Sequence, residues 1–407
     1  MFKKIFYGWY IVLSGFLLML TVYVLCISCS SLFIKPVSQS LNFSRGEFSF
    51  STTILMISYM IFSVIVGKIS KPRNIKGIII ISILLTSLSF LGYFISTNIF
   101  MFYIFSFIAG IGVSGSTIIP ISILITNWFN KKRGLALALA LTGSGVGGAI
   151  FSPVINSIIQ NHGYRYAYLT LSIILLLLII PVAIIVKPSP ESNNLKPLGY
   201  DSSVNLDNSN KEGLSLEESL KNYRLYIFIV SLVIVGIIGN GVLIHFSAAL
   251  TDLGYSETFA ANCLSIGLLL LVIGKIIQGQ VFDKFSMKIS LIYGWVFFSY
   301  TAFGLLFINN PIMLIIYIIA FGLGEGFVVV APPLMTSSFF GEKDYSSIYG
   351  VSNMAVALGG AIGTSLSGII YDYFGSYNFA WKLYSALSLI MLIIFLVLSP
   401  KKQIKIT

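Results

Sequence analysis

The 407 residues of the chain are 57% hydrophobic and only 10% charged, with a mean hydropathy of +0.93. Soluble domains carry about 25% charged residues, so this composition argues against a soluble enzyme, a nucleic-acid-binding protein and a disordered scaffold. Three cysteines form no disulfide framework, and no cofactor is expected. The net charge of +11 is explained by where the basic residues lie along the chain.

Long apolar stretches follow one another along the whole sequence. A helix needs about 20 apolar residues to cross the hydrocarbon core of a bilayer, and a spanning segment must satisfy its own backbone hydrogen bonds. The stretches do not alternate in polarity as barrel strands would, so each predicts a transmembrane helix. They cover residues 9–33, 46–66, 77–95, 99–126, 135–158, 165–186, 225–249, 257–281, 289–308, 312–335, 348–370 and 379–398.

The basic residues fall mainly on one side of this arrangement. With both termini in the cytoplasm, only Lys35, Arg45, Arg165 and Lys382 lie in outer loops, and only Lys275 lies inside a span. Cytoplasmic loops of membrane proteins carry an excess of lysine and arginine. We therefore expect a multi-pass protein of the plasma membrane with both termini cytoplasmic, and no nucleic-acid partner.

A polar stretch divides the spans into two sets of six. Residues 187–223 are rich in serine, asparagine and proline, which is typical of a cytoplasmic linker. The expected domains are an N-terminal six-helix bundle at 1–186, the linker at 187–223, and a C-terminal six-helix bundle at 224–407.

The two halves also repeat each other at one constant offset. Gly67 matches Gly279 and Pro120 matches Pro332, and the matches fall at equivalent places in the two sets of spans. Six spans return the chain to the same side, so the repeats are parallel, related by an axis along the membrane normal. The sequence thus predicts an all-α membrane protein with two six-helix bundles and a binding site at the interface between the repeats.

Several short motifs resemble those of a known family. They are YGW at 7–9, NWFNKKRGLALA at 127–138, HGYRYAY at 162–168, FFGEKDYSSIYG at 339–350 and YDYFGSYNFAW at 371–381. With these motifs the chain resembles the major facilitator superfamily over essentially its whole length and, within it, the monocarboxylate and oxalate/formate branch. The resemblance implies the major facilitator fold of 12 transmembrane helices and a secondary transporter rather than an enzyme.

The cytoplasmic loop signature of that superfamily occurs in the second half as GQVFDKFSMK at 279–288. The matching positions are Gly279, Asp283, Lys284 and Lys288. The first-half version begins at Gly67 but has Lys71 in place of the acidic residue. The resemblance implies that these residues gate the cytoplasmic side; a generic basic loop is the alternative.

Two charged residues lie well inside the predicted spans, Lys275 on the eighth and Glu325 on the tenth. An ionised side chain in the membrane costs on the order of 3 kcal/mol or more, so such residues persist when they face a cavity or a partner. The resembling transporters hold the substrate carboxylate with a base four residues before Gly279, which implies this role for Lys275. Glu325 is the expected ion-pair partner, and its protonation would free Lys275. A structural pair and a lysine reaching the cytoplasmic interface are the alternatives.

Some residues differ from those of the monocarboxylate and oxalate/formate branch, and these differences limit which substrate we expect. Proton-coupled monocarboxylate carriers often have an aspartate where this chain has Leu271, and their first-span lysine falls near Ser28. The oxalate/formate carriers have a second base in the eleventh span, and residues 348–370 contain none. One buried cation fits one carboxylate better than two, which favours a monocarboxylate over oxalate.

Four further polar residues are candidates for the site. Asn240, Tyr59 and Tyr23 are expected to contact substrate, and His245 to take part in coupling. Packing residues are the alternative for all four, because aromatic residues in spans usually pack and a lone histidine is more often a hydrogen-bonded wall residue.

These observations predict a secondary transporter of a small organic anion, working by alternating access with proton coupling or exchange. No Walker A sequence is present, so the sequence does not indicate direct ATP drive. The alternatives are transport of a sugar or an amino-acid derivative and, in a different class, a transporter-like nutrient receptor.

Overall fold

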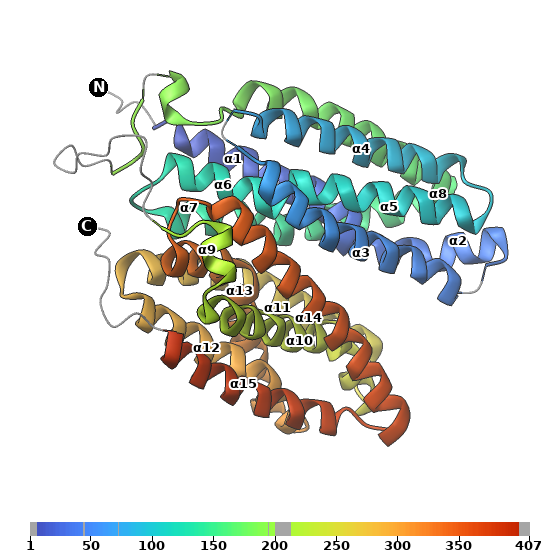
Figure 1. Cartoon of the computed structure of the whole chain (residues 1–407). Helices are drawn as coiled ribbons and strands as arrows, with labels where there is room; N and C mark the ends of the chain where they lie inside the picture. Colours follow the sequence, from blue (N-terminus) through green and yellow to red (C-terminus); the bar gives the residue numbers. More distant parts are fainter. Residues whose placement is uncertain (1–5, 44, 72, 194, 200–212, 399–407) are drawn as a thin grey trace, which may run out of the picture. The chain divides into compact units, whose positions relative to one another are not determined.

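The computed structural model describes residues 6–43, 45–71, 73–193, 195–199 and 213–398. Within these ranges nearly every ordered segment is helical, and the only β pairings are two isolated bridges. Figure 1 shows the helices. This is the expected outcome for apolar segments that must pair their own backbone groups in lipid.

The chain divides into two units, which we call unit 1 (Met1–Asp201) and unit 2 (Ser202–Thr407). The division falls within the stretch 187–223. The helices of unit 1 are α1 (Gly8–Leu18), the π-helix η1 (Met19–Ser28), η2 (Ser30–Phe33), α2 (Ile34–Leu41), α3 (Arg45–Ile69), α4 (Ile75–Ile95), α5 (Ile99–Ser116), α6 (Ile118–Trp128), α7 (Arg133–Leu141), α8 (Gly143–Ile185) and η3 (Pro190–Asn193).

The described part of unit 2 is also built of helices. They are α9 (Leu216–Leu220), α10 (Tyr223–Asp252), α11 (Glu257–Lys284), α12 (Met287–Phe303), η4 (Gly304–Phe307), α13 (Pro311–Phe340), α14 (Tyr345–Phe374) and α15 (Asn378–Leu398). Its main packing pairs are α10 with α14, α11 with α13, and α12 with α13.

Ten helical stretches of the described chain are long and apolar enough to cross a membrane. The sequence predicted twelve transmembrane helices, and the two missing from this count are explained by two local features. The stretch Arg133–Ile185 holds two expected spans, which separate where Gly163 leaves the helical conformation at φ 84° and ψ 164°. The last span is present as the shorter apolar helix Asn378–Ile394.

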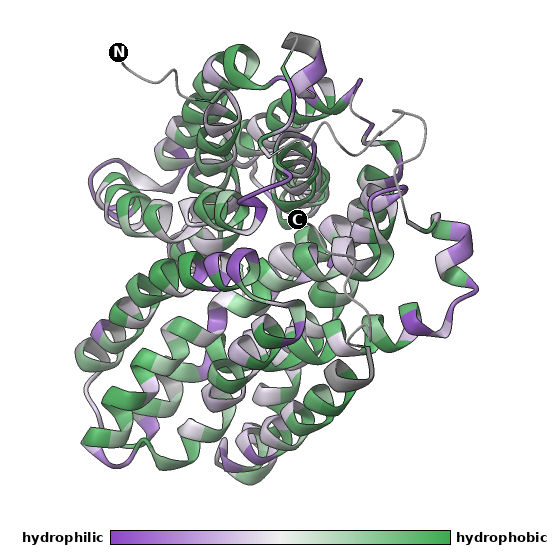
Figure 2. Cartoon of the chain, turned by 90° about the vertical axis from the view of Figure 1, so that its left-hand side faces the viewer, coloured by the Kyte–Doolittle hydropathy of each residue, from purple (hydrophilic) through white to green (hydrophobic). Residues whose placement is uncertain are grey.

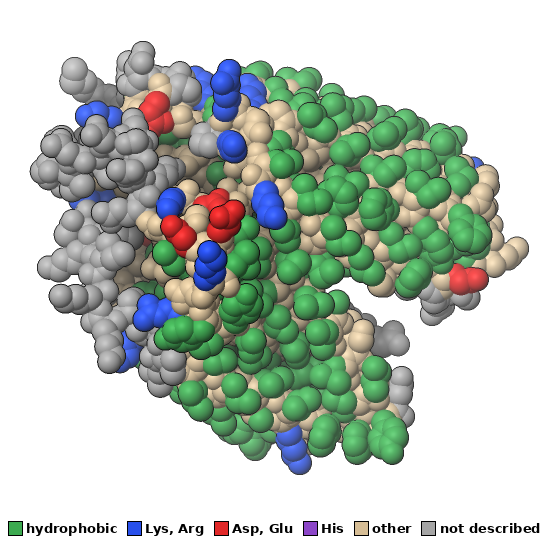
Figure 3. Space-filling view, viewed as in Figure 1, with side chains coloured by type: hydrophobic (Ala, Val, Ile, Leu, Met, Phe, Trp, Pro, Cys, Tyr) green, Lys and Arg blue, Asp and Glu red, His purple; other side chains and the backbone are tan. Residues whose placement is uncertain are grey.

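The outward surfaces of the helices are apolar. Phe100 is 71% exposed, Ile184 70% and Ile315 60%, and Figure 2 shows hydrophobic residues along the helices, with much of the hydrophilic colour in loops and at helix ends. In Figure 3 hydrophobic side chains likewise cover most of the described helical surface on the visible face. A soluble protein would bury such residues, so this surface is suited to lipid.

Within each unit, glycines let two helices approach closely. A Cβ atom at Gly147 of α8 would lie 2.2 Å from the carbonyl oxygen of Leu20, and one at Gly359 of α14 would lie 2.1 Å from that of Val233. Gly147 and Gly359 are equivalent by the sequence repeat. Small residues are the usual means of close helix packing in membranes, and here the repeat preserves the contact.

Candidate functional site

Close packing of α11 against α13 brings the two in-span charges onto facing helices. A Cβ atom at Gly274 would lie 2.3 Å from the carbonyl oxygen of Gly322, and one at Gly326 would lie 2.9 Å from the backbone nitrogen of Lys275. The backbones therefore touch directly beside Lys275 and beside Glu325. Larger residues would separate the helices and the two charges.

Lys275 and Glu325 are deeply buried, at 2% and 5% exposure. Among the charged side chains whose burial the structure describes, they are the only buried ones. The opposite charges of the two side chains attract each other. This attraction offsets part of the free-energy cost of burying ions in an apolar interior.

The carboxyl group of Glu325 lies near a third helix. A Cβ atom at Gly239 of α10 would lie 3.4 Å from Oε2 of Glu325. Within the described chain, Oε1 of Glu325 is buried without a hydrogen-bond partner. The carboxyl group therefore has an oxygen on which a proton can be held without breaking an existing hydrogen bond.

The structure adds two polar residues that the sequence analysis did not single out. Gln278, one turn after Lys275, is 2% exposed, and its amide nitrogen donates to the carbonyl oxygen of Ser290 at 3.3 Å. Tyr317, two turns before Glu325 on α13, is fully buried, and within the described chain its hydroxyl group has no hydrogen-bond partner. In the sequence, each is a polar residue inside an apolar run. Many residues that only pack have the same surroundings, so this pattern does not single out Gln278 or Tyr317.

His245 is held by hydrogen bonds on both ring nitrogens. Its Nε2 lies 3.0 Å from the carbonyl oxygen of Thr364, and its Nδ1 lies 3.1 Å from the hydroxyl oxygen of Tyr377. A carbonyl oxygen only accepts, so Nε2 carries the proton and Nδ1 of the neutral ring accepts from Tyr377. This arrangement fits the wall-residue alternative better than a role in coupling.

Asn240 lies on the side of α10 that meets α14. Its amide nitrogen donates to the carbonyl oxygen of Gly236 at 3.4 Å, and a Cβ atom at Gly360 would lie 2.7 Å from it. Tyr23 on η1 is half-buried and Tyr59 on α3 is 6% exposed; both belong to unit 1. Substrate contact by these three residues stays a prediction.

The predicted gating residues lie at helix ends. On α11, Gly279 is buried, whereas Asp283 and Lys284 are exposed at its last turn; Lys288 is exposed on the first turn of α12. In unit 1, Gly67 is buried near the end of α3. Their gating role stays a prediction.

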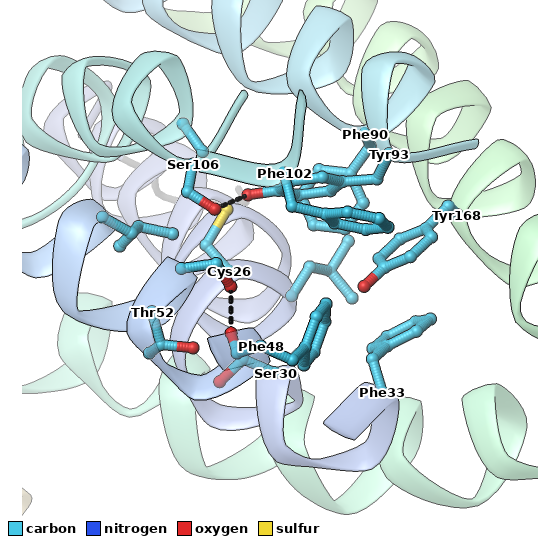
Figure 4. A pocket seen from close by; sticks show the side chains of 14 residues that line it. Cys26, Ser30, Phe33, Phe48, Thr52, Phe90, Tyr93, Phe102, Ser106 and Tyr168 are labelled. Carbon is cyan, nitrogen blue, oxygen red and sulfur yellow. Dashed lines mark hydrogen bonds between the residues drawn. The ribbon is translucent and has the colours of Figure 1, made fainter. Parts of the chain in front are cut away.

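A small cavity of about 30 Å³ lies in unit 1 (Figure 4). Its wall includes Cys26, Tyr93, Ser106 and Tyr168, and the hydroxyl groups of Tyr93 and Ser106 are hydrogen-bonded at 2.8 Å. A water molecule needs at least about 10–15 Å³, so this cavity has room for water but not for an organic substrate.

Comparison with known proteins places the chain in a family. It matches the Major Facilitator Superfamily over residues 11–311 and 228–406. Monocarboxylate transporter 13 of Rattus norvegicus is 22% identical over 384 residues, covering 91% of this chain and 84% of the relative. Monocarboxylate transporter 12 of Mus musculus is also 22% identical, over 412 residues, with 93% and 82% coverage.

Solved structures show the same fold. The proton:xylose symporter XylE bound to 6-bromo-6-deoxy-D-glucose superposes with a TM-score of 0.76 at 16% identity, covering 97% of this chain and 96% of the other. The FucP transporter in its outward conformation gives 0.71 at 16% identity, with 97% and 99% coverage.

The chain belongs to the Major Facilitator Superfamily. It is a multi-pass membrane transporter of a small solute with the major facilitator fold, and the expected fold class is confirmed. Its resemblance to the monocarboxylate branch is borne out by the distant relatives.

Proposed function

We propose that the protein transports a small monocarboxylate by alternating access. The observation that carries the proposal is the burial of Lys275 and Glu325, two opposite charges on packed helices of an apolar unit. A buried ammonium group favours a negatively charged ligand, because transfer of that ligand from water then gains a countercharge. The monocarboxylate transporters among its relatives support the same substrate class.

In this proposal the substrate carboxylate competes with Glu325 for Lys275. The lysine ammonium is a compact point charge rather than a bidentate fork, so it suits one carboxylate group. A proton on Glu325 removes the competing charge and frees Lys275 for the substrate. Uptake of the anion is then linked to uptake of a proton, whereas exchange of one anion for another needs no release of the proton from Glu325.

We further propose a plasma-membrane location with both termini in the cytoplasm. The distribution of lysine and arginine supports this orientation. The exposed side chains of Lys68 and Lys382 belong to opposite sides in this topology. A cysteine at 382, but not one at 68, should react with an impermeant maleimide in intact cells.

The substrate class is tested by uptake into proteoliposomes. Labelled lactate, pyruvate, formate, oxalate, xylose and fucose are offered with and without an inward proton gradient. We expect saturable uptake of lactate or pyruvate, weaker uptake of oxalate and none of the sugars. Saturable sugar uptake without any anion uptake would replace this proposal by the sugar alternative.

Coupling is tested with Glu325→Gln, which carries no charge at any pH. We expect this variant to exchange internal for external monocarboxylate while losing accumulation driven by a proton gradient. Undiminished gradient-driven accumulation in Glu325→Gln would show that Glu325 does not carry the coupled proton.

A further inference from the structure

A cavity of about 190 Å³ lies at one end of unit 2, where α10, η4 and α14 end and α15 begins. In the proposed topology this is the outer end of the unit. A water molecule needs at least about 10–15 Å³, so the cavity has room for a small organic molecule. The described residues that line it include neither Lys275 nor Glu325, so it is separate from the proposed substrate site.

Three polar side chains at the ends of helices line this cavity. Asp252 is the last residue of α10, Asn309 follows η4 and Asn378 is the first residue of α15. All three are exposed, and within the described chain their side chains form no hydrogen bond or ion pair. Asp252 is the only charged residue among the described residues of the wall. The cavity therefore offers a ligand one carboxylate and two amide groups, and its charge favours a cation.

Aromatic rings form another part of the wall. The ring centre of Tyr377 lies 4.5 Å from that of Tyr371 and 5.4 Å from that of Trp381, and the three rings are stacked. The faces of such rings attract cations. A metal ion such as Ca²⁺ instead needs about 6–8 oxygen ligands, and within the described chain no group of three or more His, Cys, Asp or Glu side chains could hold one. The wall thus suits an organic cation better than a metal ion.

The internal repeat relates part of this wall to a place in unit 1 that is already occupied. By the constant offset of the repeat, three residues of the wall correspond to three residues of unit 1; Ile308, Ser376 and Tyr377 correspond to Ser96, Tyr164 and Arg165.

In unit 1 the guanidinium group of Arg165 lies between the other two residues of this set. Its Nη2 donates to the carbonyl oxygen of Ser96 at 3.4 Å, and its Nε donates to the hydroxyl oxygen of Tyr164 at 3.2 Å. Its Cζ lies 5.9 Å from the centre of the Tyr164 ring. One half of the molecule therefore holds an organic cation, against a carbonyl oxygen and an aromatic ring, at the place where the other half has the cavity.

Two positions explain why the halves differ. Unit 2 has Tyr377 at the position of Arg165, and its hydroxyl group donates to Nδ1 of His245 at 3.1 Å. By the same offset, unit 1 has Phe33 at the position of His245, and phenylalanine offers no hydrogen-bond acceptor to a hydroxyl group. His245 thus holds Tyr377 in the wall, and no side chain of unit 2 takes the place of the arginine among the described residues of the wall.

We propose that the cavity is a binding site for a small organic cation that carries a guanidinium or primary ammonium group. Asp252 supplies the countercharge, the amide oxygens of Asn309 and Asn378 accept hydrogen bonds from the cation, and the aromatic rings contact its apolar part. The site favours a cation, whereas the proposed substrate is an anion, so the two sites bind different molecules. The proposal is independent of which solute is transported.

Binding of propylguanidinium, which has the shape and charge of the end of an arginine side chain, tests the site directly. Propylurea has the same shape and no charge. Both are titrated against the purified full chain in an uncharged maltoside detergent, followed by ligand-observed NMR. We expect propylguanidinium to bind saturably with a Kd on the order of 1 mM, and propylurea to bind about tenfold more weakly. Equal affinities for the two compounds, or no saturable binding of propylguanidinium, would overturn the proposal.

Two variants assign this binding to the cavity. Asp252→Asn removes the countercharge and should weaken binding of propylguanidinium about fivefold, whereas binding of propylurea should not change. Asn309→Arg supplies a tethered guanidinium group and should abolish binding of propylguanidinium. Glu217→Gln, which removes an exposed carboxylate from α9, is the control and should bind as the wild type does. All three should unfold at the wild-type temperature, and an unchanged Kd in Asp252→Asn or in Asn309→Arg would overturn the proposal.

Competition distinguishes the sources of the cation. Phosphatidylethanolamine carries a primary ammonium group, and phosphatidylcholine, which has no N–H donor, is its control. Weaker binding of propylguanidinium with the first lipid alone would identify a lipid headgroup as the occupant, and equal binding with both would identify a dissolved cation. Displacement of propylguanidinium by calcium chloride, at an ionic strength matched with sodium chloride, would assign the cavity to a metal ion and overturn the proposal.

Discussion

At the scale of single residues, the proposed function depends on two ionisable side chains in an apolar interior. Lys275 and Glu325 could be singled out from the sequence because charges inside long apolar runs are costly. Their packing beside Gly274 and Gly326 could not be predicted from the sequence, because it depends on which helices pack together. The two hydrogen bonds of His245 could not be predicted for the same reason, because Thr364 and Tyr377 are distant from His245 in the sequence.

Removing one member of the buried pair should destabilise unit 2. Lys275→Met leaves the Glu325 carboxylate without its countercharge, and breaking a buried pair in this way costs about 3 kcal/mol. The double variant Lys275→Met with Glu325→Leu removes both ions and should recover most of the loss. Thermal unfolding of the purified variants in detergent measures the effect; equal midpoints for the single variant and wild type would contradict the pairing.

We expect His245 to have a structural role rather than a role in coupling. Tyr377→Phe removes the hydroxyl group that donates to Nδ1 and should cost about 1 kcal/mol of stability. His245→Gln should lower the unfolding midpoint while the pH profile of transport keeps its shape. A profile that becomes flat in His245→Gln would instead assign His245 to coupling.

At the scale of elements, the long apolar stretches predicted the helices well. The structure merges two predicted spans in α8, and they separate where Gly163 leaves the helical conformation. The close helix contacts at glycines could not be predicted, because the partner helix depends on tertiary packing. The π-helix η1 in the first span has no signal in the sequence, because its residues are almost all apolar and show no period from which a helix type could be recognised.

The glycine contact between α11 and α13 should be sensitive to one methyl group. Gly274→Ala places Cβ 2.3 Å from the carbonyl oxygen of Gly322 and forces the helices apart, so stability should fall by about 1–3 kcal/mol. Gly77→Ala in α4 is the control, because a Cβ atom there meets nothing within 4 Å, and helix propensity should make it neutral or stabilising. Equal unfolding midpoints for the two variants would contradict the contact.

The helix α9 docks on the loop between α13 and α14, where Glu218 forms an ion pair with Lys343 at 3.2 Å, and this docking should depend on pH. The backbone N–H of Ser215, and then Lys343, hold the pKa of Glu218 below its ordinary value of 4.5. The carboxylate therefore stabilises the docked helix above about pH 4.5, and this contribution is lost as the pH falls through the lower pKa of the docked state.

The mobility of a nitroxide at Glu217→Cys, followed by electron paramagnetic resonance between pH 3 and 7, reports this transition. The label should become more mobile only at the acid end. The same label combined with Glu218→Gln should show no such transition, and an identical transition in that variant would contradict the role of Glu218.

At the scale of the whole molecule, the apolar composition, the charge distribution and the internal repeat predicted the fold class correctly. The fold does not identify the solute, because the matching solved structures include sugar symporters and the sequence relatives include monocarboxylate transporters. We propose that the choice between these substrates depends on the chemistry around Lys275, whose ammonium group is buried.

The most direct measurement is counterflow exchange of labelled lactate in proteoliposomes, compared with its uncharged amide, lactamide. The wild type should exchange lactate at least tenfold faster than lactamide. Lys275→Gln should lose this preference, whereas Lys382→Gln, which removes an exposed lysine, should keep it. Lactate exchange at the wild-type rate in Lys275→Gln would contradict the assignment of Lys275 as the anchor of the carboxylate.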